Sequence, residues 1–130
     1  MRITSTAISL NVPHPRASAD FLQRHLGFEI AMEQDDSFVS LVHPDGGPNV
    51  IYLQTGLATF KPADRAGSAG DGLLLVFVVD DVDRAHARLV ADGAAVVTPP
   101  ETEPWGERFS QYRDPNGIVV QLVQWVNGSG

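Results

Sequence analysis

Two segments of this 130-residue chain repeat one pattern at a fixed spacing. A strand-like alternation ends at Val12 and again at Val79, 67 positions later. The helical pattern that follows ends near Gly27 and again near Gly93, 66 positions later. Two nearly equal offsets in a chain of this length indicate a duplicated supersecondary unit. This duplication constrains the fold more than any single motif does.

The first copy has the pattern of a strand, a helix and three further strands. Residues 7–12 alternate between apolar and smaller or polar side chains, which is the period of two expected of a strand. Pro15 suits the first turn of a helix, and Gly27 suits its end. Segments of turn-forming composition then separate three predicted strands, at residues 28–32, 38–43 and 49–55.

The second copy follows the same plan. A predicted strand at residues 73–79 leads into Asp80, Asp81 and Asp83, whose carboxylates are typical of a helix start. The helix carries an apolar stripe and is followed by predicted strands at residues 94–98, 108–113 and 118–125.

Each copy is therefore predicted to be a βαβββ module, which places the chain in the α+β class. We expect a single domain over residues 1–130, with module one at about 1–57, a linker at about 58–72 and module two at about 73–127. The linker is predicted because its central part is polar and rich in Ala and Gly.

The composition excludes several classes of function. The chain has no cysteine, which rules out disulfides and thiolate metal sites. Its formal net charge of -7 argues against nucleic acid, because such binding depends on Lys and Arg that neutralise phosphates. The longest apolar runs are much shorter than the roughly 18 residues of a membrane span. We therefore expect a cytoplasmic protein that binds neither nucleic acid nor membranes.

Five short motifs occur in order along nearly the whole chain. They are Phe21-Leu22, Leu26-Gly27-Phe28, Val79-Asp80-Asp81-Val82, Pro104-Trp105-Gly106-Glu107-Arg108 and Asp114-Pro115-Asn116-Gly117. In this order they resemble the vicinal-oxygen-chelate superfamily, which includes glyoxalase I, extradiol dioxygenases and bleomycin-resistance proteins. The resemblance implies that two βαβββ modules form a cup-shaped incomplete barrel with the helices outside. It also implies a homodimer with cups shared between subunits.

The resemblance also locates the positions where metal-dependent members hold their ion. A His near the start of the first strand of each module would fall on Ala7 and Leu74. A Glu in the last strand would fall on Gln121 in module two and near Tyr52 or Gln54 in module one. Two hydrocarbon side chains and neutral groups do not hold a divalent ion, so we predict no metal and no other cofactor.

The cup is instead predicted to bind an organic ligand, because it mixes apolar and hydrogen-bonding side chains. The resemblance, applied with strand alternation, implies that Ile8, Leu10 and Val12 pack beneath the first helix and that Ala7, Ser9 and Asn11 face the cup. The cup positions are the apolar Leu74, Val76 and Val78 and the polar Ser9, Asn11, Tyr52, Gln54 and Gln121.

Trp105 is the most informative single residue, because it lies between Pro104 and Gly106 in a predicted loop. This segment is similar to the Pro-Trp-Gly stretch of bleomycin-resistance proteins, whose Trp lines the ligand groove and stacks on flat rings. A Trp that only plugs the end of the barrel is the alternative. Phe38 and Phe109 are further candidates, although Phe38 also suits the core and alternation alone does not fix the face of Phe109.

The predicted function is therefore non-catalytic binding and sequestration of an aromatic or glycopeptide-like antibiotic, which would confer resistance. No nucleophile motif or phosphate loop is present, and Glu107-Arg108 is interpreted as part of an ion pair at a strand edge. The first alternative is a metal-dependent lyase, isomerase or dioxygenase of the same superfamily. The second is a regulatory or scaffolding module.

Overall fold

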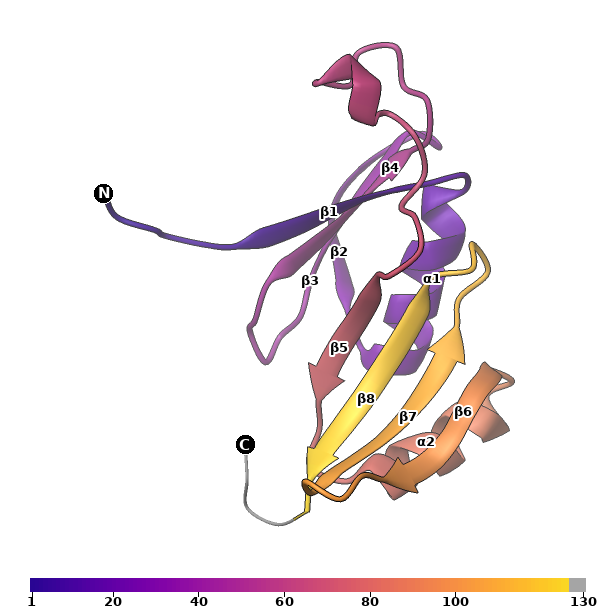
Figure 1. Cartoon of the computed structure of the whole chain (residues 1–130). Helices are drawn as coiled ribbons and strands as arrows, with labels where there is room; N and C mark the ends of the chain where they lie inside the picture. The colour runs from indigo at the N-terminus through magenta and orange to yellow at the C-terminus, as the bar shows by residue number, and fades with distance from the viewer. Residues whose placement is uncertain (127–130) are drawn as a thin grey trace. The chain divides into compact units, whose positions relative to one another are not determined.

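The computed structural model describes residues 1–126 and divides the chain into two compact units. The first unit covers Met1–Asp71, and the second begins at Gly72. Each unit has one four-stranded sheet and one α-helix (Figure 1). Residue 127, the predicted end of module two, lies outside the described residues.

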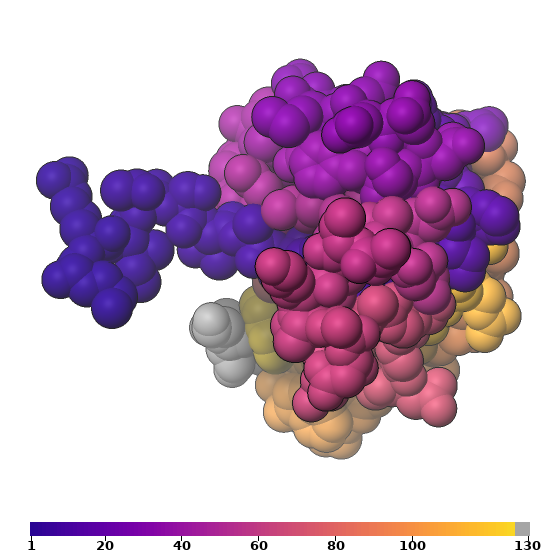
Figure 2. Space-filling view, turned by 90° about the horizontal axis from the view of Figure 1, so that it is seen from above, coloured from indigo at the N-terminus to yellow at the C-terminus, as the bar shows by residue number. Residues whose placement is uncertain are grey.

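The first unit contains β1 (Ala7–Val12), α1 (Pro15–Leu26), β2 (Glu29–Gln34), β3 (Phe38–Val42) and β4 (Asn49–Gln54). Its sheet has the order β1-β4-β3-β2, in which β1 is parallel to β4 and the other pairs are antiparallel. A short 3-10 helix, η1 (Ala63–Arg65), follows in the predicted linker. Figure 2 shows the N-terminal residues that precede β1 standing away from the rest of this unit.

The second unit contains β5 (Leu74–Val78), α2 (Val82–Ala91), β6 (Ala95–Thr102), β7 (Glu107–Arg113) and β8 (Val119–Trp125). Its sheet has the order β5-β8-β7-β6, and β5 is parallel to β8. The second sheet therefore has the same strand order and the same parallel pair as the first sheet. The prediction of two βαβββ modules in an α+β fold is therefore confirmed.

The helix ends confirm the capping residues that the sequence indicates. Pro15 occupies the first turn of α1, and Gly27 ends it with a left-handed backbone at φ 76°. The Asp81 side chain accepts a hydrogen bond from the backbone N–H of Arg84 at 3.0 Å and so caps α2. No helix in residues 1–126 is both long and apolar enough to cross a membrane.

One strand is longer than predicted. The sequence predicts an end at Thr98, because Pro99 and Pro100 follow, yet β6 continues to Thr102. β6 lies at the edge of its sheet, and its pairing with β7 shifts register on both sides of Thr98. Proline is tolerated at such edges and bulges because its missing N–H leaves no ladder partner unsatisfied. The other strand ends lie within two residues of the predicted ones.

The core of each unit lies between its helix and one face of its sheet. In the first unit, Leu22, Val39, Leu41 and Tyr52 are at 0% exposure. In the second unit, Val82, Leu89, Tyr112, Val120 and Leu122 are buried. The opposite face of each sheet carries no α-helix of its own unit, and we call it the helix-free face.

The linker is tied to the end of β1 by Asn11. The side-chain amide of Asn11 donates to the carbonyl oxygens of Arg65 and Gly67, both at 3.0 Å. Its backbone carbonyl accepts from the N–H of Ala69 at 2.8 Å. The linker segment around η1 is therefore held against the first unit by one side chain of β1.

His43 joins the end of α1 to the turn after β3. Its Nε2 lies 2.8 Å from the carbonyl oxygen of Leu26, and its Nδ1 accepts from the backbone N–H of Asp45 at 3.0 Å. Because a carbonyl only accepts, these two partners define a neutral ring protonated at Nε2. The ring also meets Phe28 edge-on, with centroids 4.9 Å apart.

We expect His43→Ala to lower the free energy of unfolding by about 2 kcal/mol, because it removes two hydrogen bonds and a packed ring. Urea unfolding followed by circular dichroism measures the change. Asp45→Ala is the control, since it keeps the backbone N–H that donates to Nδ1 and removes a carboxylate that is 93% exposed and lies 3.7 Å from the same atom. Equal losses in the two variants would contradict this role for His43.

Candidate functional site

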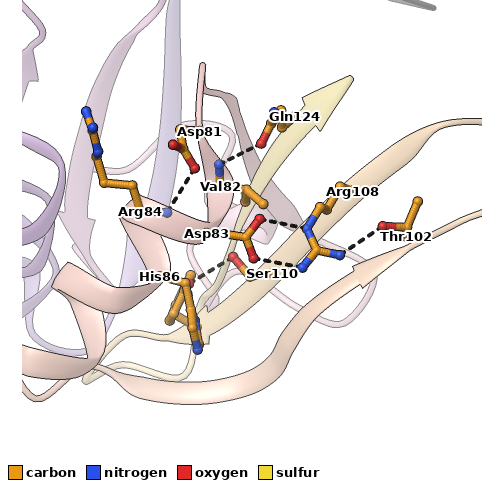
Figure 3. A network of polar contacts seen from close by, with 10 residues as sticks. Asp81, Val82, Asp83, Arg84, His86, Thr102, Arg108, Ser110 and Gln124 are labelled. Atoms are coloured by element: carbon orange, nitrogen blue, oxygen red, sulfur yellow. Dashed lines mark hydrogen bonds and ion pairs between the residues drawn. The ribbon is translucent and has the colours of Figure 1, made fainter. Parts of the chain in front are cut away.

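The face of the second sheet that packs against α2 is occupied by structural contacts. Arg108 makes a two-pronged ion pair with Asp83 of α2, at 2.8 and 2.7 Å, and Gln124 accepts from the backbone N–H of Val82 (Figure 3). The Arg108 hydrogen bond holds the pKa of Asp83 below its usual value, and the same contact raises the pKa of Arg108. Of the predicted ion pair of Glu107-Arg108 at a strand edge, only the participation of Arg108 is found: its partner is Asp83 of α2, Glu107 takes no part, and β7 lies inside the sheet.

Strand alternation places the neighbouring residues on the helix-free face of this sheet. β7 and β8 pair without a register shift from Glu107 opposite Trp125 to Arg113 opposite Val119. Since Arg108 and Gln124 face α2, residues at odd positions of both strands face away from it. The helix-free face therefore carries Glu107, Phe109 and Gln111 of β7, Gln121, Val123 and Trp125 of β8, and Leu74, Val76 and Val78 of β5.

A continuous row of hydrogen bonds crosses this face. Thr98 Oγ1 donates to Gln111 Oε1 at 2.7 Å, and Gln111 Nε2 donates to Gln121 Oε1 at 2.8 Å. Gln121 Nε2 then lies 3.5 Å from Glu107 Oε2, at the limit of a hydrogen bond. Trp105 Nε1 donates to the other carboxylate oxygen of Glu107 at 3.2 Å. We call Thr98, Gln111, Gln121, Glu107 and Trp105 the polar row.

Trp105 occupies the turn that connects β6 to β7. The N–H of Gly106 donates to the carbonyl oxygen of Glu103 at 3.0 Å, and Gly106 has φ 92°, a conformation that favours glycine. The turn leaves Trp105 59% exposed, while its indole N–H is held by Glu107. The residue therefore presents an oriented aromatic surface to solvent and is not a plug inside the unit.

An apolar strip borders the polar row on the β5 side. Leu74, Val76 and Val78 are 45%, 48% and 66% exposed, although strands normally bury such side chains. Toward the middle of the sheet, Gln121 and Val123 are only 9% and 1% exposed. The face thus combines exposed hydrocarbon, the exposed indoles of Trp105 and Trp125, and oriented amide groups, which is the composition of a surface that binds small molecules.

Five of the predicted site residues meet on this one face. Trp105, Phe109 and Gln121 lie on or beside the polar row, and Leu74 and Val76 lie on the apolar strip. The pairing of Phe109 with Val123 decides the face that alternation alone left open.

The predicted residues of the first unit divide between two faces. Ser9, Asn11 and Phe38 share its helix-free face, and the side-chain N–H groups of Asn11 are bound to the linker. Tyr52 pairs with the buried Leu10, has 0% exposure and lies in the core, so no ligand reaches it in this conformation. Gln54 pairs with the buried Val12 and shares that face.

The register identifies the residue that matches Gln121 in the first unit. Val76 pairs with Gln121, and Ser9, 67 positions before Val76, pairs with Ile51. The counterpart is therefore Ile51, one residue away from the predicted Tyr52, and a shift of one residue changes the face. Because Ile51 has no polar atoms in its side chain, the first sheet has no equivalent of the bond between Gln111 and Gln121.

Glu107, Gln111 and Thr98 were not predicted as site residues. Alternation in Glu107-Arg108-Phe109-Ser110-Gln111 carries the signal, since the odd positions share a face with Gln121. A bulge near Trp105 would have inverted that count. The register shifts lie instead between β6 and β7, at positions that leave the β7 and β8 pairing regular.

The positions that would hold a metal in this fold do not fit one. Ala7, Leu74 and Ile51 have no donor atoms in their side chains, and the oxygen of Gln121 already accepts from Gln111. Across the described residues 1–126, no group of three or more His, Asp or Glu side chains is placed to hold an ion. We therefore derive no chemical step through a metal.

A family model described as the Glyoxalase/Bleomycin resistance protein/Dioxygenase superfamily matches residues 2–122. The chain belongs to this superfamily. The resemblance indicated by the ordered motifs is thereby confirmed. No match is found among curated proteins.

Several solved structures share the fold of this chain. TnmS3, an antibiotic binding protein from Streptomyces sp. CB03234, is 26% identical over 95% of this chain and 98% of its own, with a TM-score of 0.73. TioX from Micromonospora sp. ML1 is 25% identical over 95% and 99%, also with a TM-score of 0.73. A lactoylglutathione lyase from Agrobacterium tumefaciens is 20% identical over 99% and 98%, with a TM-score of 0.78, and shows likeness of fold alone.

Proposed function

We propose that this protein binds a planar aromatic small molecule of the antibiotic class and sequesters it without transforming it. The observation that carries the proposal is the exposed indole of Trp105, held by Glu107 at one end of the polar row. Sequestration of this kind would confer resistance on the cell that makes the protein.

Binding would follow from the composition of the helix-free face of the second sheet. A flat ring placed on Trp105 gains stacking and removes both surfaces from water. The apolar strip adds contact area, while the amides of Gln111 and Gln121 are already oriented by their mutual bond and lose little freedom on binding. The similarity to TnmS3, an antibiotic binding protein, supports the same class of ligand.

Binding is favoured over catalysis by the chemistry of the polar row. Its members are a hydroxyl, two amides, an indole and one carboxylate, so Glu107 is its single ionisable group. The hydroxyl of Thr98 donates to an amide oxygen, which is not a base that would activate it. An enzyme of the same superfamily is the alternative, and stoichiometric metal in protein grown with Ni, Zn, Fe and Mn would favour it.

Several expectations from the family resemblance stay predictions. These are the organisation of residues 1–130 as one functional domain, the cup that both modules enclose, and the homodimer with shared cups. Sedimentation equilibrium measures the oligomeric state directly.

The proposed function is tested by titrating the protein with bleomycin-type, quinone and enediyne-type antibiotics. The chain has two tryptophans, and both lie at the helix-free face, so quenching is followed in the wild-type protein and in Trp125→Phe, where Trp105 is the sole indole. We expect saturable quenching of Trp105 fluorescence by at least one planar ligand, which mass spectrometry then recovers unchanged. Absence of binding across the panel, or recovery of a modified ligand, would contradict sequestration.

Two equally exposed valines test whether the apolar strip contributes to ligand binding. Val76 on β5 and Val90 on α2 are both 48% exposed. We expect Val76→Ala to weaken binding about fivefold, because the lost methyl groups contribute roughly 1 kcal/mol of buried contact. Val90→Ala should leave affinity unchanged, and thermal unfolding checks that both variants are folded. Equal affinities in both variants would remove the apolar strip from the binding surface.

A further inference from the structure

The hydrogen bonds of the polar row all run in one direction. Thr98 donates to Gln111, Gln111 donates to Gln121, and the Gln121 amide N–H points at Glu107. Trp105 also donates to Glu107, from the other side. An indole N–H and an amide N–H are donors only, so Glu107 serves as an acceptor at both oxygens. The row of donors therefore ends on the carboxyl group of Glu107.

The negative charge of Glu107 is not balanced by a cation of the chain. Among residues 1–126, the side chains of Arg and Lys make no ion pair with it, and its contacts are the two neutral donors. The nearby Arg108 points to the other face of the sheet, where Asp83 engages it. A carboxylate offers about four acceptor positions, so two remain after Trp105 and Gln121 are counted.

The carboxylate also lies beside the exposed indole of Trp105, and the partly exposed Trp125 is its partner residue on β8. The bond from Trp105 Nε1 to Glu107 Oε1 couples the position of the indole to that of the charge. The face of an indole itself attracts cations through its quadrupole. Partial burial of Glu107 between the row and the turn reduces the screening of its charge by water. Both groups therefore favour the same kind of ligand at the same place.

We propose that this face selects planar aromatic ligands that carry a cationic amine, with the ring on Trp105 and the ammonium group on Glu107. The inference rests on the proposed function, and it adds a ligand class and a specificity-determining residue. Gln121 and Gln111 act as positioning residues, because their directed bonds hold the Glu107 carboxylate in place. The formal net charge of -7 attracts the same ligands over longer distances.

The test compares two ligands that share one ring system. 2-(Aminomethyl)anthraquinone is cationic at neutral pH, and 2-(hydroxymethyl)anthraquinone is neutral and nearly equal in size. We expect the wild-type protein to bind the amine about tenfold more tightly, which is the size of one charge-assisted hydrogen bond at a partly exposed site. In Glu107→Gln this preference should fall to about one. Isothermal titration calorimetry at 50 mM and 300 mM NaCl measures both affinities.

Glu103→Gln is the matched control, because it removes the same formal charge from the same turn. It should keep the preference for the amine, whereas equal loss in Glu103→Gln and Glu107→Gln would assign the preference to overall charge and overturn the proposal. Equal binding of both ligands by the wild-type protein would also overturn it, yet would leave the proposed function intact. If neither ligand nor any antibiotic of the panel binds, both proposals fail. Thermal unfolding of each variant shows whether it is folded.

Discussion

Replacement of Tyr112 by alanine is expected to lower the free energy of unfolding by about 3–5 kcal/mol, the range for deletion of a large buried aromatic side chain. Tyr112 is completely buried on β7 under α2. Its hydroxyl donates to Ser110 Oγ at 2.8 Å and lies 2.8 Å from His86 Nδ1. Loss of the side chain leaves a cavity beneath β7, whose other face carries Phe109 and Gln111. We therefore expect urea unfolding to show a lower free energy of unfolding, and ligand titration to show a lower affinity.

Tyr112→Phe separates the hydroxyl from the ring. We expect a loss of about 1–2 kcal/mol at neutral pH, because Ser110 and His86 each lose a buried partner. A loss in Tyr112→Phe as large as that in Tyr112→Ala would contradict the central role of ring packing. Exposed Val90→Ala should stay within about 0.5 kcal/mol of the wild-type protein.

The stability that the Tyr112 hydroxyl contributes is expected to depend on pH. Burial of the Tyr112 side chain raises the pKa of its hydroxyl. The folded protein therefore holds this proton more tightly than the unfolded chain does. The resulting stability is complete below the ordinary tyrosine pKa of about 10 and is lost as the pH rises above it. The stability difference between wild type and Tyr112→Phe should accordingly shrink in alkaline urea titrations, and a growing difference would contradict the sign.

The fold could be predicted because its signals are local and occur twice. Strand alternation, the glycine after α1 and the aspartate before α2 each depend on backbone geometry within a few residues. The spacing of 67 positions then makes one copy a check on the other. The end of β6 could not be predicted, because tolerance of Pro99 and Pro100 depends on β6 being an edge strand, which is a tertiary property.

Residues of the candidate site could be predicted only where a motif fixes the position of a residue in its strand. The proline and glycine neighbours of Trp105 predict its place in a turn, and a hairpin motif fixes the position of Gln121 in β8. In the first unit no such motif lies next to β4, and an error of one residue selected the buried Tyr52 instead of Ile51. Glu107 is a member of the site only through bonds to Trp105 and Gln121, which lie on different elements.

Replacement of Trp105 by alanine is expected to weaken binding of a planar aromatic ligand about 30-fold, which corresponds to roughly 2 kcal/mol for a central aromatic contact. The indole is 59% exposed in the free protein, so its removal should change the free energy of unfolding by no more than about 1 kcal/mol. A large effect on binding combined with a small one on stability is the signature of a contact made with the ligand. Because the variant lacks the reporter, calorimetry or ligand absorbance must measure its affinity.

Trp105→Phe tests which property of the indole matters. Phenylalanine keeps a flat ring but has no N–H to donate to Glu107, so the ring loses its fixed orientation. We expect an affinity between those of wild type and Trp105→Ala if stacking on an oriented ring drives binding. Unchanged affinity in Trp105→Ala would show that the indole only closes the turn between β6 and β7. The ligand surface would then have to be sought on the apolar strip of β5, where Val76→Ala reports independently.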